Sequence, residues 1–450
     1  MNTLFSKYVL IIFLATCSGC TTYAQFTGDF RTHVASRNYT QALENLNTAK
    51  KGNNKLLYLL ETGLIAHYQQ QYEKSNRYFA AAEKHANELY TKSVTRQAVA
   101  LITNDAIKKY RGESFELVAI HYYRALNYWY LGQPEDALVE CRKANLKLAQ
   151  YAIHNGETSY KNDAFIHYIT GLFYEATGEY NDAYISYQHA QDAYEHYASE
   201  FQIPAPQTLE SDLQRVSESL NGVQLVSLDP TAFLAPASDG ELVIFSEVGF
   251  VPRKLEEEID LPIYDNDIKR SKKIKTSVLA KDISDRRHRV RHVGNVEYWL
   301  QVALPKYDAT PPQTNTVYIR SGEHNGQTTL AQNYASIAQT SLNHHYPGIL
   351  AKTTARAFVK YLAYRKAKKE NKVLGFLTNL LNVSTEIADT RSWVSLPHNI
   401  QIGRLALTPG THTVTLEARD INGNVIETKT IENVEINPGQ RTFISHRFYR

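Results

Sequence analysis

The run Asp389-Thr390-Arg391-Ser392-Trp393 has the residue types and spacing best suited to chemistry in this sequence. A carboxylate and a guanidinium two residues apart on an extended segment point to the same face, where they could form a polar cluster beside Trp393. The same Asp–Arg pair could instead hold a neighbouring loop in place. The sequence favours the structural role and leaves ligand binding open as the alternative.

The motifs of common enzyme classes are missing from the sequence. It contains no Gly-x-Ser-x-Gly elbow, no phosphate-binding Gly-x-x-x-x-Gly-Lys loop and no His-Glu-x-x-His pair. No nucleophile can be matched to a general base. We therefore expect a protein that is not an enzyme, has no catalytic residues and needs no cofactor; a hydrolase would need carboxylates clustered in a pocket.

Histidine and cysteine do not predict a metal site, although the chain has 16 histidines. His121 and His167 fall where helices are expected to pack, and no histidine has a second ligand at a convincing spacing. Cys141 follows Ala137 by one helical turn, as a buried residue of a helix would. We expect no metal and a buried thiol.

Residues 1–19 have the features of a signal peptide. Lys7 precedes an apolar run, Tyr8–Ala15, that is too short to span a bilayer, and small residues lead to Cys20. This arrangement resembles a bacterial lipoprotein signal, in which the cysteine is acylated, although Cys17 stands where leucine is usual. Plain secretion is the alternative.

If Cys20 carries lipid, the residue after it bears on the destination of the protein. Thr21 stands where an aspartate would resemble an inner-membrane retention signal. We therefore expect a protein anchored to the outer membrane by lipid on Cys20, facing the periplasm, with residues 20–29 as a short tether.

The rest of the chain is organised around Asn162–Gln191, whose small and aromatic residues have the spacing of a helix–turn–helix repeat. Small residues let two antiparallel helices approach, and aromatic residues fill the space beside them. The pattern resembles a tetratricopeptide repeat and recurs at residues 56–86 and 121–148. The positions expected to pack within repeats are Gly63, Tyr72, Ala125, Gly132, Ala137, Gly171, Tyr174, Gly178 and Ala183.

About three such repeats would form a short helical solenoid over residues 30–220. By analogy with solenoids of this type, we expect a concave face that takes an extended segment or a helix of a partner protein. Tyr68, Tyr128 and Tyr174 are candidates for that contact, although the sequence cannot separate binding tyrosines from core ones.

Residues 221–450 change to a β-rich composition. Strands are expected at Glu241–Pro252, Val296–Pro305 and Ile400–Leu407, then at Thr411–Arg419, Val425–Ile436 and Arg441–Tyr449. A helical pair, broken at Tyr346-Pro347-Gly348, is expected as an insertion over residues 328–385. The simplest arrangement is a β-sandwich that carries this insertion.

A basic run occupies residues 269–291, where ten lysines and arginines oppose only Asp282 and Asp285. It could contact anionic lipid headgroups or an acidic partner. A solvated loop, balanced by the acidic residues 256–267, is the favoured interpretation. Because the run has no aromatic residues, stacking on single-stranded nucleic acid is not expected.

Three stretches resemble a largely uncharacterised family of proteobacterial outer-membrane lipoproteins with repeat-containing N-terminal halves. They are residues 121–145, residues 240–254 and residues 388–416. The resemblance implies a role in the cell envelope, since related proteins occur with other small outer-membrane lipoproteins, some of them similar to activators of cell-wall synthases.

These observations lead us to expect an α+β multidomain protein, with a tetratricopeptide-like solenoid followed by a β-sandwich-like domain. We expect a protein-binding scaffold or accessory factor of the envelope, with partners such as cell-wall synthesis factors or other lipoproteins, and no nucleic acid. The alternative is direct binding of cell-wall glycan or a lipid surface through the basic run and the cluster of Asp389, Arg391 and Trp393.

Overall fold

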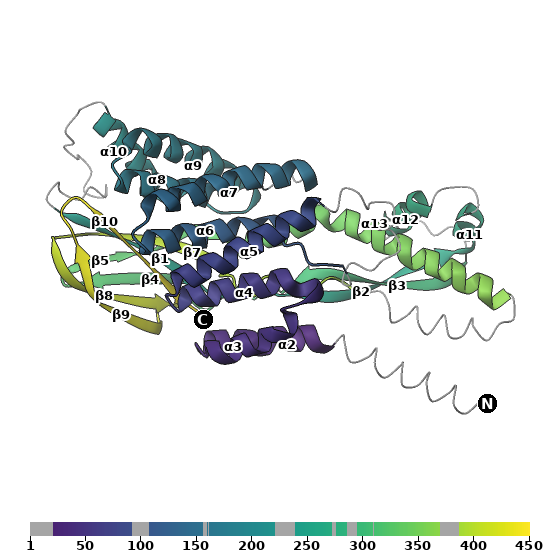
Figure 1. Cartoon of the computed structure of the whole chain (residues 1–450). Coiled ribbons are helices and arrows are strands. Elements are labelled where there is room, and N and C mark those ends of the chain that lie inside the picture. The colour runs from purple at the N-terminus through teal and green to yellow at the C-terminus, as the bar shows by residue number, and fades with distance from the viewer. Residues whose placement is uncertain are drawn as a thin grey trace.

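The structure is a computed structural model that describes residues 21–91, 108–155, 160, 162–220, 239–271, 276–285, 295–308, 310–369 and 387–450. Cys20, the expected signal peptide and part of the basic run lie outside the described residues. The described chain is of the α+β class (Figure 1). None of its helices combines the length and the hydropathy needed to cross a bilayer.

The first half of the chain is helical. Its helices are α2 (Thr21–Ala35), α3 (Tyr39–Asn45), α4 (Lys55–Tyr68), α5 (Tyr72–Thr91), α6 (Ser114–Tyr130), α7 (Pro134–Asn155), α8 (Ala164–Ala176), α9 (Tyr180–Glu200) and α10 (Thr208–Leu220), with short 3-10 turns at Leu46–Ala49 and Gly52–Asn54. The hairpins α4–α5, α6–α7 and α8–α9 coincide with the three repeats expected from the sequence.

Glycines set the close approach inside two of these hairpins. A Cβ atom on Gly171 would lie 2.3 Å from Tyr187 Cε1, and one on Gly63 would lie 2.8 Å from Phe79 Cδ1. Gly132 and Gly178 adopt positive φ values of 70° and 82° just after α6 and α8, where a left-handed residue ends a helix. The small residues therefore act at the contacts and turns that their spacing predicts.

Two four-stranded sheets form most of the β-rich half. The first has the order β10-β1-β7-β6 and the second the order β5-β4-β8-β9. The strands are β1 (Gly240–Val248), β4 (Thr316–Ser321), β5 (His324–Gln327), β6 (Thr329–Asn333), β7 (Asn399–Leu407), β8 (Gly410–Arg419), β9 (Val425–Ile436) and β10 (Arg441–Phe448). All neighbours pair antiparallel except β1 and β10, which are parallel.

The first sheet is a middle layer, because both of its faces are covered. In β1, Leu242 and Ile244 join a core with residues of the second sheet such as Val317 and Leu416. The alternate residues Val243 and Phe245 join the core of the helical hairpins. Successive side chains of a strand point to opposite faces, so β1 is buried along its whole length. The helices and the sheets therefore share one core across the expected boundary at residue 220.

An arm projects from this body (Figure 1). It consists of the ribbon β2 (Lys254–Tyr264) and β3 (Val296–Tyr307) together with α11 (Asp265–Ser271), α12 (Thr276–Asp285) and α13 (Tyr334–Lys369). Its own core includes Leu261, Leu300 and Phe358. In the basic run, Arg270 pairs with Asp282 at 2.6 Å between α11 and α12.

Helix α13 corrects the expected helical pair at 328–385, because it continues through Pro347. Proline removes a backbone hydrogen bond from a helix interior, so the sequence suggested a break there. Tertiary packing overrides that preference. Ile337 lies in the core of the body and Phe358 in the core of the arm, so one helix bridges both. Residues 328–333 are in part the strand β6.

The N-terminal segment also differs from expectation. Residues 21–35 form α2, where a tether was expected over residues 20–29. Phe30 and Val34 lie one helical turn apart and are fully buried in a cluster that includes Ile65 and Tyr449. Burial of these two side chains against α4 and the C-terminus accounts for the helix.

Candidate functional site

The face of α4, α6 and α8 that points toward the first sheet, called the inner face below, is filled by the chain itself. Trp129 of α6 packs edge-on against Phe443 of β10 with ring centroids 4.9 Å apart, and Phe173 of α8 does the same at 5.2 Å. Tyr68 of α4 donates a hydrogen bond of 2.6 Å to Glu247 of β1. The sheet thus occupies the surface on which a partner was expected.

The tyrosines singled out for partner binding lie in different places. Tyr68 is directed at the sheet, as described above. Tyr174 is only 8% exposed, and its hydroxyl accepts a bond of 2.6 Å from Arg142 of α7. Tyr128 is half-buried at the end of α6, with the Arg124 guanidinium 6.0 Å from its ring centroid. They do not form one exposed recognition surface.

The cluster predicted at residues 389–393 is divided by the fold. Arg391 pairs with Asp389 through bonds of 2.8 Å from Nε and 2.7 Å from Nη2. Its Nη1 atom donates to the backbone oxygen of Lys108 at 2.8 Å. Trp393 is fully buried among helical residues, 5.8 Å from the ring centre of Phe79. The Asp–Arg pair therefore holds a neighbouring loop, which was the favoured interpretation, and Trp393 belongs to the core.

Two buried carboxylates of the helices hold the backbone that follows. Glu116 accepts a bond of 2.6 Å from the Trp393 amide, and Glu61 accepts one of 2.9 Å from the Val394 amide. Glu61 also accepts a hydrogen bond from the Ser395 hydroxyl. Burial raises the pKa of Glu61 to about 8 and that of Glu116 to about 7. Sequence analysis missed both residues, since nothing in a helical repeat distinguishes a glutamate that faces another segment.

An ionic ring fixes the helices to the sheet at the other end of the inner face. Three carboxylates alternate with three arginines around it, and each side chain is 15% exposed or less. In ring order the residues are Glu175, Arg215, Asp212, Arg404, Glu241 and Arg441. The distances between charged atoms include 2.7 Å for Arg441–Glu175 and 2.6 Å for Arg441–Glu241. The charges balance, so this ring has a structural role.

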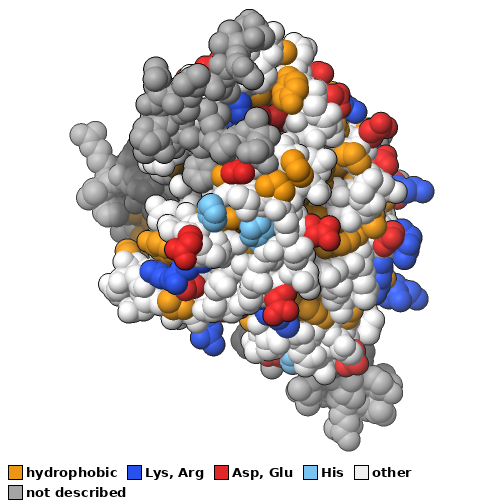
Figure 2. Space-filling model, turned by 90° about the vertical axis from the view of Figure 1, so that its left-hand side faces the viewer, with side chains coloured by type: hydrophobic (Ala, Val, Ile, Leu, Met, Phe, Trp, Pro, Cys, Tyr) orange, Lys and Arg blue, Asp and Glu red, His pale blue; other side chains and the backbone are white. Residues whose placement is uncertain are grey.

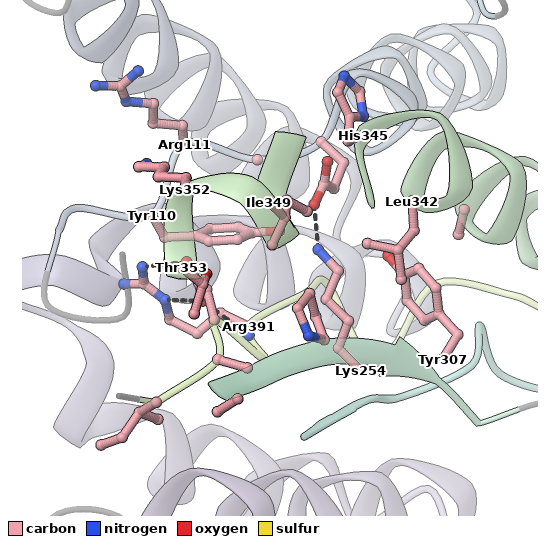
Figure 3. Close-up of a pocket in the computed structure, with 18 of the residues that line it drawn as sticks. Tyr110, Arg111, Lys254, Tyr307, Leu342, His345, Ile349, Lys352, Thr353 and Arg391 are labelled. Atoms are coloured by element: carbon pink, nitrogen blue, oxygen red, sulfur yellow. Dashed lines mark hydrogen bonds and ion pairs between the residues drawn. The ribbon is translucent and has the colours of Figure 1, made fainter. Parts of the chain in front are cut away.

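The Asp389–Arg391 pair lies at the edge of a cavity of about 470 Å³ (Figure 3). This cavity, called the junction pocket below, is lined by the start of α6, by the ribbon β2–β3, by α13 and by residues 387–391. Lys254 rises from β2 and pairs with Glu113, which caps α6 (Figure 3). The charge of Lys254 lowers the pKa of Glu113 despite burial.

The described residues hold no group of three histidine, cysteine or acidic side chains arranged to bind a metal ion. His167 and His121 lie in the helical part, where His121 Nδ1 is 2.8 Å from Glu140 Oε2 between α6 and α7. Cys141 is fully buried, and burial raises the pKa of its thiol to about 12. A neutral buried thiol is unreactive, as its spacing suggested.

The comparisons with known proteins add little to this geometry. No family model and no curated protein matches the chain. Among solved structures, the crystal structure of the apo form of RapI is similar with a TM-score of 0.32 and 15% sequence identity. That match covers 49% of this chain and spans 55% of the RapI chain.

Proposed function

We propose that the protein is a non-enzymatic lipoprotein of the cell envelope that binds protein partners through the outer surface of its helical repeats. The observation that carries this proposal is the filled inner face, where Tyr68 and Trp129 contact β1 and β10. Since the sheet covers the side usually used for recognition, a partner is left with α5, α7 and α9. The β-rich half then serves as the platform that holds the repeats rigid.

Exposed apolar side chains support this assignment. Leu146 of α7 is 65% exposed, and Tyr180 and Ile185 of α9 are each 43% exposed. Such residues contribute binding energy when a partner removes them from water. At the end of the molecule seen in Figure 2, charged groups of both signs are scattered among hydrophobic areas.

The test is in-cell crosslinking of the lipidated chain, followed by purification and mass spectrometry. One variant combines Leu146→Glu with Ile185→Glu on the outer helices. The matched control combines Ile421→Glu with Val425→Glu, which are exposed apolar residues of the β8–β9 hairpin. We expect a defined envelope protein with the wild type and the control but not with the helix variant. Equal recovery from all three chains would contradict the proposal.

Direct binding of a small envelope molecule, a glycan or a lipid, is the second candidate function. The junction pocket favours it, because Asp389 and Arg391 line a cavity of about 470 Å³. This volume falls within the range of roughly 300–1,000 Å³ usual for small-molecule sites. The two functions are compatible, since the pocket and the outer helices are different surfaces.

A further inference from the structure

The junction pocket has two chemically different sides. In Figure 3 the charged ends of Arg111, Lys352 and Arg391 lie along one side of the pocket, whereas Leu342 and Tyr307 lie on the other. These residues come from the segment before α6, the ribbon, α13 and the segment before Trp393. The pocket therefore exists only because the arm is joined to the body.

Positive charge exceeds negative charge among the described lining residues. The cations are Arg111, Lys254, Lys352, Arg356 and Arg391, whereas the carboxylates are Glu113 and Asp389. Glu113 is engaged by Lys254 and Asp389 by Arg391. Arg111 is exposed and forms no ion pair with a described residue. A guanidinium at the mouth of a partly enclosed cavity favours an anion, because a carboxylate or phosphate can accept paired hydrogen bonds from it.

The lining also includes apolar side chains, which together are called the apolar wall below. Ala338, Leu342 and Ile349 of α13 line the pocket together with Ala303 and Pro305 of β3. Leu342 is only 7% exposed, but Ile349 is half-buried, so part of this wall is still in contact with water and could be covered by a ligand. An anion without an apolar part would not cover this wall. An uncharged apolar molecule would place the cations of the lining beside a ligand that offers them no negative charge.

We propose that the junction pocket binds an anionic amphiphile: a single carboxylate or phosphate held by Arg111 and Lys352, with a short apolar portion against Leu342 and Ile349. The inference rests on the second function proposed above and names its ligand class. The ligand would be either a membrane phospholipid or a free alkyl acid. The fold gives a reason for the position, since a ligand there would touch the body and the arm at once.

The test measures binding by calorimetry to residues 20–450 with Cys20→Ser, so that no acyl chain or detergent competes for the pocket. The probes are octanoate, octyl phosphate, dihexanoyl phosphatidylglycerol, neutral octanol and inorganic phosphate. We expect the charged amphiphiles to bind at one site, and octanol and inorganic phosphate to bind at least about tenfold more weakly. Octanol has no negative charge to accept charge-assisted hydrogen bonds, and inorganic phosphate has no apolar portion to cover the apolar wall. Tighter binding of the phospholipid or of the alkyl acids identifies the source, and either result supports the proposal.

The pocket variant is Arg111→Glu with Lys352→Glu, and Arg111→Glu alone serves if the double variant unfolds. The matched control is Arg77→Glu with Lys84→Glu, which reverses one arginine and one lysine exposed on α5. We expect at least about a tenfold loss of affinity in the pocket variant and none in the control. Absence of binding to the charged amphiphiles, equal binding of octanol or phosphate, or equal loss in the control would overturn the proposal. The crosslinking result for the outer helices is independent of all these outcomes.

Discussion

Arg404 of β7 and Asp212 of α10 form a buried ion pair that joins the first sheet to the helix after the last repeat, with Arg404 Nη1 2.6 Å from Asp212 Oδ2. Buried charges are costly to remove from water, so such a pair persists only where every charge is matched. The ionic ring provides that match, because its three carboxylates alternate with three arginines and each charged side chain pairs with two of opposite sign. The orientation of the helices on the sheet is thereby specified by charge as well as by apolar packing.

Asp212→Asn should therefore destabilise the protein strongly. The substitution keeps the shape but leaves the ring with one uncompensated positive charge, which costs about 3–5 kcal/mol in buried pairs. Urea unfolding measures the change. The control is Glu427→Gln, whose partner Arg37 is 45% exposed and 3.1 Å away, and which should cost under about 1 kcal/mol. Equal losses in the two variants would show that the ring is not the source of the stability.

Gly171→Ala tests the close packing of α8 and α9. The added Cβ would meet Tyr187 at 2.3 Å, and overpacking of this kind costs about 1–3 kcal/mol. Gly348→Ala in α13 is the matched control, because no atom lies within 4 Å of its Cβ position. There alanine should leave the free energy of unfolding unchanged or raise it by up to about 1 kcal/mol. A neutral Gly171→Ala variant would mean that the helices are further apart than described.

Stability should fall as pH rises from 7 to 9. The folded pKa of Glu61, about 8, lies above that of an unfolded glutamate, so its contribution is complete below pH 4.5 and is lost as pH rises through 8. Glu116 acts in the same direction with a pKa of about 7. The two should remove about 1–2 kcal/mol over this window.

Urea unfolding at both pH values measures this loss, and Glu61→Gln should reduce it because the amide does not titrate. Residues with lowered pKa values affect stability in a different range of pH. Arginines hold the pKa of Glu241 at about 2 against the effect of burial. Burial lowers the pKa of His167 to about 4. Their contributions are lost only under acid conditions. An unchanged slope in Glu61→Gln would assign the pH dependence to other groups.

Cys20→Ala tests the lipid anchor expected from the sequence. Without the thiol there is no acylation site, so the protein should remain unprocessed or become soluble. Membrane fractionation and intact-mass measurement detect either state, and Cys141→Ala serves as the control because that thiol is buried in the core. Membrane association with a normal processed mass in Cys20→Ala would rule out the anchor.

The elements that could be predicted from sequence are those with a strong local pattern. Gly63 and Gly171 mark the helical hairpins. Between the strands expected at Thr411–Arg419 and Val425–Ile436 lies Asn422-Gly423, a dipeptide typical of tight turns in β-hairpins, and these strands pair as β8 and β9. The strand β2 was missed because Lys254–Tyr264 contains four acidic residues on a ribbon with one face in solvent. Local composition in such a strand indicates a loop, and only pairing with β3 shows otherwise.

The contacts between the two halves could not be predicted for a different reason. Glu247 accepts hydrogen bonds from Tyr68 and Tyr122, which lie more than a hundred residues away. No periodicity in either segment encodes that pairing. The same holds for the junction pocket, whose lining comes from five separate segments of the chain. Of its residues, only Asp389 and Arg391 were among the candidates from sequence.

The most direct test of the filled inner face is photocrosslinking in intact cells with p-azidophenylalanine at one of two tyrosines. Tyr180 lies on the outer helix α9 and is 43% exposed, whereas Tyr68 faces Glu247 on the inner face. We predict a crosslink to another envelope protein from position 180, and only a crosslink within the chain from position 68. A crosslink from position 68 to the same envelope protein would show that the repeats open to a partner, and would contradict the account.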